Sequence, residues 1–78
     1  MKELIEYIAR SLVDDPTQVD VREGRSGSAT NLRLRVAKED MGRVIGRNGR
    51  VANAMRILLK VSAARENKRT HLDIVDPE

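Results

Sequence analysis

The sequence predicts a single α+β domain with the element order α-β-β-α-α-β, in which three helices pack on one face of a three-stranded mixed sheet. One observation is that the apolar residues switch between a helical period and the alternating period of a strand in that order. Another is that two helical runs separate the last two strand-like runs. A connection of this kind forms a right-handed crossover that places two strands side by side and parallel. We assign residues 1–76 to the domain and residues 77–78 to a tail.

Residues 2–13 have the apolar spacing of a helix that buries one face. A residue that precedes proline disfavours helical geometry, so the helix should end where Asp15 precedes Pro16. The residues on the expected buried face are Leu4, Ile5, Ile8 and Leu12.

The next two runs alternate apolar and polar residues, as the strands of a half-buried sheet do. The polar segment 24–30 between them is rich in glycine and serine, so the pattern predicts an antiparallel hairpin. Because this segment is longer than a tight turn, we expect a mobile connection. The strands cover residues 17–23 and 31–37, with Val19, Val21, Leu32, Leu34 and Val36 at alternate positions.

Two helices should follow, separated by a pair of glycines. The first is short and ends at Gly46, and the second runs from Gly49 to about Ala64. Residues 70–76 then alternate again and predict the closing strand. The residues expected to face the core from the two helices are Met41, Val44, Ile45, Val51, Met55, Leu58, Leu59 and Ser62.

Composition excludes several classes of function. The chain has no cysteine, which rules out disulfides, thiolate catalysis and cysteine-bound metals. Its one histidine, His71, rules out sites with several histidine ligands, and we expect it to be a surface residue. We find no nucleophile–base pair and no cofactor loop, so we expect no enzyme, cofactor or small-molecule substrate. Acidic residues interrupt the apolar ones near the N-terminus, so we expect a soluble, cytoplasmic protein without membrane contact.

Positive charge is concentrated in one part of the chain. Residues 42–69 contain eight basic side chains and one acidic side chain, whereas the net charge of the whole chain is only +3. Such asymmetry is typical of a surface that binds an anionic partner, either nucleic acid or a membrane. The alternative is a solvated helix face with no ligand.

The segment VIGRNGR, residues 44–50, places two glycines at a turn between two helices. A helix N-terminus carries about half a positive elementary charge, and its free N–H groups attract phosphate. Glycines allow positive φ angles and a close approach of the backbone to a ligand. The alternative is a plain corner between helices, with Gly46 as C-cap and Asn48 or Gly49 as N-cap. The pattern matches neither a P-loop nor a dinucleotide-binding loop.

With the element order, this GxxG motif resembles a KH domain of the second type. The stretches EDMGRVIGRNGRVANAMR and AARENKRTHLDIVD are similar to the small, stand-alone bacterial KH proteins of the KhpA family. The resemblance implies binding of single-stranded RNA, with the GxxG loop on the sugar–phosphate backbone. It implies an apolar groove wall at Val44 and Ile45, with the opposite wall near His71, Leu72 and Asp73. The implied contact residues are Val44, Ile45, Gly46, Arg47, Asn48, Gly49 and Arg50, and further candidates are Arg43, Arg65, Lys68 and Arg69.

One absence agrees with a KH groove. The only aromatic residue, Tyr7, lies in the first predicted helix. RNA-recognition motifs and cold-shock domains stack bases on aromatic side chains of their sheets. Recognition must therefore use phosphate contacts, hydrogen bonds and aliphatic packing.

The resemblance also implies partners and a cellular role. Members of the family form homodimers and pair with a larger KH-containing protein, and they are linked with global RNA association and with cell shape. We therefore expect a broad-specificity RNA-binding regulator or RNA chaperone that acts as a dimer. Ile57 and Val61 are the candidate interface, unless the short helix or the last strand covers them. The alternative function is a protein-interaction module for the larger partner, with RNA contact secondary.

Overall fold

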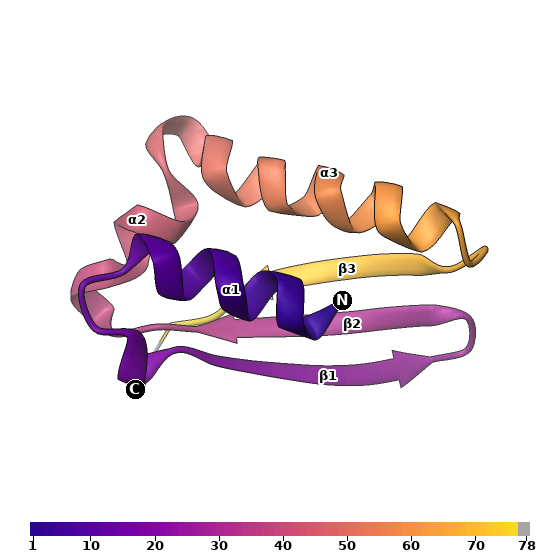
Figure 1. The fold of residues 1–78 in the computed structure, drawn as a ribbon, viewed down its shortest axis with the longest axis horizontal. Coiled ribbons are helices and arrows are strands. Elements are labelled where there is room, and N and C mark those ends of the chain that lie inside the picture. Colours follow the sequence, from indigo (N-terminus) through magenta and orange to yellow (C-terminus); the bar gives the residue numbers. More distant parts are fainter. Residues whose placement is uncertain (77–78) are drawn as a thin grey trace.

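A computed structural model describes residues 1–76, and the tail predicted at 77–78 lies outside the described residues. Figure 1 shows the expected order of elements, α-β-β-α-α-β. Three short 3₁₀ turns, η1 (Pro16–Gln18), η2 (Lys38–Asp40) and η3 (Arg47–Gly49), connect them. The main elements are α1 (Lys2–Leu12), β1 (Asp20–Ser26), β2 (Ala29–Arg35), α2 (Met41–Ile45), α3 (Arg50–Ala64) and β3 (Arg69–Ile74).

The strands form one mixed sheet in the order β1-β2-β3. β1 pairs with β2 in antiparallel fashion, and β2 pairs with β3 in parallel. All three helices lie on the same face of this sheet (Figure 1). The predicted fold class and topology are therefore confirmed, and β3 is left with one free edge.

The core lies between the helices and the sheet. From α1, Ile5 and Ala9 are fully buried, and they pack with the central strand residues Leu32 and Leu34. Burying an isoleucine or leucine side chain contributes about 1.5–3 kcal/mol, so a few such residues hold the helices and the sheet together. None of the helices in residues 1–76 is long and apolar enough to cross a bilayer.

The hairpin differs from the prediction. β1 continues to Ser26 and β2 begins at Ala29, so only Gly27 and Ser28 lie between the strands. Gly27 has φ +61°, the geometry that glycine supplies in two-residue hairpin turns. The prediction of a long, mobile connector was wrong. Residues 24–26 are polar but extend β1, in a part of the strand where both faces are exposed. An exposed strand end has no apolar alternation to reveal it.

The buried face of α3 also differs. The helix buries Ala52, Met55, Leu59 and Ala63, whereas Leu58 is 48% exposed. Val51 and Ser62 are half-buried. The small alanines allow the helix to lie close to the sheet, which turns the larger Leu58 outward.

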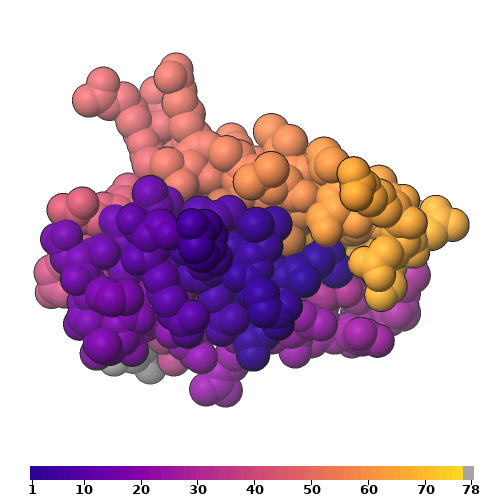
Figure 2. Space-filling view, viewed as in Figure 1, coloured from indigo at the N-terminus to yellow at the C-terminus, as the bar shows by residue number. Residues whose placement is uncertain are grey.

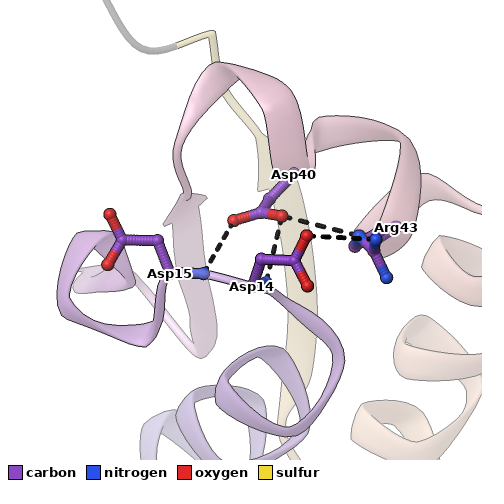
Figure 3. Close-up of polar contacts among 4 residues, drawn as sticks. All are labelled: Asp14, Asp15, Asp40 and Arg43. Carbon is purple, nitrogen blue, oxygen red and sulfur yellow. Dashed lines mark hydrogen bonds and ion pairs between the residues drawn. The ribbon is translucent and has the colours of Figure 1, made fainter.

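A buried carboxylate ties the segment after α1 to the start of α2 (Figure 3). Asp40 is only 2% exposed, and its two oxygens accept hydrogen bonds from the backbone N–H groups of Asp14 and Asp15, both at 3.1 Å. Arg43 approaches the same carboxylate at 3.6 Å and the carboxylate of Asp14 at 3.1 Å. Each oxygen of Asp40 therefore has a donor, as a buried carboxylate requires.

Asp40→Asn is expected to lower the free energy of unfolding by about 2 kcal/mol. The asparagine side chain has only one acceptor oxygen. Its NH₂ group would face the backbone N–H of Asp14 or Asp15, which would then have no hydrogen-bond acceptor. Asp14→Asn is the matched control because that side chain also contacts Arg43 but is 77% exposed. We expect the control substitution to lower the free energy of unfolding by less than about 0.5 kcal/mol. Urea titration of both variants measures the difference, and equal stability would contradict the assigned role of Asp40.

Candidate nucleic-acid interface

The segment that joins α2 to α3 is a tight loop in which Gly46, Asn48 and Gly49 have positive φ. Gly46 ends α2 with its N–H donating to the carbonyl of Gly42 at 2.9 Å, and it has φ +78°. Asn48 and Gly49 follow with φ +58° and +74°. Glycine and asparagine are the residues that adopt such angles at least cost. The loop conformation thus follows directly from the residues Gly-Arg-Asn-Gly.

The two glycines of the loop are required for different reasons. A Cβ on Gly46 would lie 2.5 Å from Cγ2 of Val51 and 2.9 Å from the backbone nitrogen of Val51. A Cβ on Gly49 would meet no atom within 4 Å. Only Gly49 therefore leaves open space beside the backbone. The expectation that both glycines clear room for a ligand is wrong for Gly46, where Val51 occupies that room.

The free backbone donors of the loop lie at its tip. The N–H of Gly49 donates to the carbonyl of Gly46 at 3.2 Å, and the N–H of Arg50 donates to the carbonyl of Arg47. Within residues 1–76 the structure records no backbone acceptor for the N–H groups of Arg47 and Asn48. Both residues are exposed. In Figure 2, side chains from the segment between α2 and α3 project from the surface at the upper left.

One of the two predicted contact residues just before the loop has another position. Val44 is fully buried in the core and cannot contact a ligand, so its assignment to the groove wall was wrong. Ile45 is half-buried. The α2 helix turns Val44 toward the sheet. Arg43, a further candidate, forms its ion pairs with Asp14 and Asp40 on the side of α1.

A cleft of about 590 Å³ lies between α3 and the free edge of β3. The predicted second wall, near His71, Leu72 and Asp73, lines this cleft. The remaining lining residues are Asn53, Arg56, Ile57, Leu59, Lys60 and Thr70.

The cleft begins close to the loop. Asn53 lies four residues after Gly49 on α3, which corresponds to about 6 Å along a helix axis. At the other end, a smaller hollow shares Lys60, Thr70 and His71 with the cleft and adds the candidates Lys68 and Arg69. Lys68 pairs with Glu66 at 3.8 Å, and Arg65 is exposed but lines neither hollow.

The outer face of α3 carries an exposed apolar patch. Ile57 and Val61 are 60% and 59% exposed, so neither α2 nor β3 covers them. With Leu58 they form an exposed patch that we call the α3 patch, Ile57, Leu58 and Val61. Ile57 also lines the cleft, so the α3 patch and the cleft adjoin. Among residues 1–76, no group of three His, Cys, Asp or Glu side chains is placed to hold a metal ion.

Comparison with known proteins matches residues 2–74 to the family described as KhpA/KhpB, KH domain. The chain belongs to this KH-domain family. Relatives named RNA-binding protein KhpA include one from Clostridium acetobutylicum, 49% identical over 75 residues that cover 96% of this chain and 100% of the relative. One from Treponema pallidum is 49% identical and covers 96% of this chain and 94% of the relative. One from Listeria monocytogenes is 40% identical and covers 97% and 100%.

In this KH domain the sequence did not reveal the role of Arg56. Its Nε and Nη2 donate to the carbonyl of Leu72 at 3.2 and 3.1 Å. Its Nη1 donates to Oδ1 of Asn53 at 3.4 Å. No spacing rule links residues this far apart in sequence. The only available signal was the position of Arg56 next to the core face of α3.

Proposed function

We propose that this KH domain binds single-stranded RNA, with the sugar–phosphate backbone at the Gly46–Gly49 loop and the bases in the cleft between α3 and β3. The observation that carries the proposal is that the exposed loop immediately precedes α3, the helix whose residues from Asn53 onward line that cleft. Two free N–H groups and the side chains of Arg47 and Arg50 there suit a phosphate. The relatives named as RNA-binding proteins support the same conclusion.

The expected footprint is about four nucleotides, the number that a KH domain clamps. The net charge of residues 42–69 supplies the long-range attraction, and Arg56 and Lys60 bring part of it to the cleft. Aliphatic groups such as Ile57 offer contact surface to bases in place of aromatic rings. The function is binding without catalysis, and the cytoplasm is the proposed location.

Binding of a short single-stranded RNA should weaken steadily as salt is added. Each neutralised phosphate contributes a slope of about 0.7 in a plot of log affinity against log salt concentration. Fluorescence anisotropy with a labelled RNA of eight nucleotides, titrated at several potassium chloride concentrations, measures this slope. An affinity independent of salt would contradict the proposed backbone contacts.

We further propose that the working form is a dimer, formed with a second copy or with a larger KH-containing protein through the α3 patch. Exposed aliphatic residues at helical spacing are typical of an association surface. Two linked sites raise apparent RNA affinity through effective concentration, which suits a broad-specificity RNA regulator or RNA chaperone. If RNA contact is secondary, the α3 patch carries the function alone, and loss of Arg47 leaves it intact.

The double variant Ile57→Asp, Val61→Asp is expected to sediment as a monomer at concentrations where the unchanged protein is a dimer. Two carboxylates would then have to be desolvated on association. Tyr7→Asp, Ser11→Asp is the matched control because it places the same charge at the same spacing on exposed positions of α1. Unchanged mass of the α3 variant would refute the interface. Val61→Asp alone separates dimer formation from RNA binding, since Val61 does not line the cleft.

A further inference from the structure

The free edge of β3 carries a defined set of backbone groups. The N–H of Arg69 donates to Ser28 at 3.3 Å and that of Val75 donates to Leu34 at 3.0 Å, so the odd-numbered residues direct their backbone groups toward β2. Backbone groups of successive strand residues point to opposite sides. Thr70, Leu72 and Ile74 therefore direct their N–H and C=O groups away from β2. Thr70 and Leu72 also line the cleft.

Arg56 occupies one of these edge groups. Its Nε and Nη2 donate to the Leu72 carbonyl at 3.2 and 3.1 Å, and Nη1 donates to Asn53 at 3.4 Å. A guanidinium has five N–H donors and no acceptor, so about two donors remain after these three bonds. At Leu72 the edge would otherwise offer one donor and one acceptor. With Arg56 bound there, it offers donors only.

We propose that Arg56 is a specificity-determining residue that makes the cleft discriminate against adenine at the position beside Leu72. The inference rests on the proposed RNA-binding function and deepens it. The Leu72 N–H and the remaining N–H groups of Arg56 match a base edge with two adjacent acceptors. The structure thus assigns Arg56 a role in base selection as well as in charge.

The chemistry of the base edges decides which bases fit. Adenine places its N6 amino donor beside a ring acceptor on both of its exposed edges, so that amino group would face the donors of Arg56. Cytosine offers the adjacent acceptors N3 and O2, and guanine offers O6 and N7. An unpaired donor facing another donor leaves both unsatisfied in a partly desolvated cleft, which weakens binding.

Removal of Arg56 should reverse this preference. In Arg56→Met the Leu72 carbonyl becomes free, and the edge regains the donor–acceptor pair that adenine matches. Lys60→Met is the matched control because Lys60 lines the same cleft one turn later, yet it makes no hydrogen bond to the strand edge among the described residues. Both variants lose one positive charge from the same wall.

The experiment compares the dissociation constants of oligo(rC) and oligo(rA), each of eight nucleotides, at one fixed salt concentration. We expect the unchanged protein to bind oligo(rC) about three- to tenfold more tightly than oligo(rA), the size of one hydrogen-bond difference. In Arg56→Met that ratio should fall toward one. In Lys60→Met both RNAs should weaken while the ratio stays as in the unchanged protein.

Three results would overturn the inference. The first is equal binding of oligo(rC) and oligo(rA) by the unchanged protein, a measurement that requires no variant. The second is a ratio that does not change in a folded Arg56→Met protein, even if its melting temperature falls, because Arg56 would then only brace α3 against β3. The third is an equal change of the ratio in Lys60→Met. Failure of the unchanged protein to bind either RNA would instead refute the proposed function, and this inference with it.

Discussion

Replacing Arg47 and Asn48 together by aspartate should abolish RNA binding while leaving the fold intact. Two carboxylates would then face the phosphate at the loop tip in place of a guanidinium and an amide. The loss of two charge-assisted contacts corresponds to at least about a hundredfold weaker binding. The fold should survive because both side chains are exposed and aspartate, like asparagine, tolerates the left-handed conformation of residue 48.

Anisotropy with a short single-stranded RNA measures the affinity, and circular dichroism checks the fold. The matched control is Lys2→Asp, Gln18→Asp, which changes the net charge equally at positions outside the loop and the cleft. We expect the control to lose less than about tenfold in affinity, through long-range electrostatics alone. RNA binding at the level of the unchanged protein in the loop variant would rule out the proposed mechanism.

Gly46→Ala should destabilise the protein much more than Gly49→Ala. Both residues have positive φ, which costs an alanine about 1–2 kcal/mol. At Gly46 the new Cβ would also lie 2.9 Å from the backbone nitrogen of Val51, an atom that cannot move without shifting the start of α3. We expect a total of about 3 kcal/mol at Gly46, against about 1 kcal/mol at Gly49.

Thermal unfolding followed by circular dichroism compares the two variants directly. For a domain of this size 1 kcal/mol corresponds to roughly 4–8 °C in melting temperature, so Gly46→Ala should fall by about 15 °C and Gly49→Ala by about 5 °C. The two positions also differ in ψ, which is 172° at Gly46 and 16° at Gly49. The difference in melting temperature therefore reports the contact with Val51 together with the greater backbone strain at Gly46. Equal melting temperatures would show that the space beside Gly46 is not filled as described.

The sequence was sufficient for the order of elements and for both helices that flank the loop. Gly46 has a backbone constraint that acts locally, so the end of α2 is visible without a structure. The end predicted from Pro16 is less accurate, because α1 stops at Leu12 and Val13 is already extended. The strand residues Leu32 and Leu34 were recognisable because β2 is central and buries one complete face. The two helices between β2 and β3 form a crossover connection, and this predicted the parallel pairing of β3 with β2.

Other features depend on contacts that no local pattern contains. Ala52 and Ala63 are buried in place of Leu58 because the distance between α3 and the sheet selects small residues. Val44 looked available for a groove wall, but one helical residue of α2 must fill the core. The hydrogen bonds from Arg56 to Leu72 join residues on different elements, and only the folded chain brings them together.

The carboxylate of Asp40 makes the N-terminal helix an integral part of the domain. A fragment that starts at β1 would keep the loop and the cleft, yet the carboxylate of Asp40 would lose the two amide donors of Asp14 and Asp15. It would also uncover Leu32 and Leu34, which Ile5 and Ala9 shield. Any attempt to trim this KH domain to a smaller autonomous scaffold must therefore retain the whole chain from α1 onward.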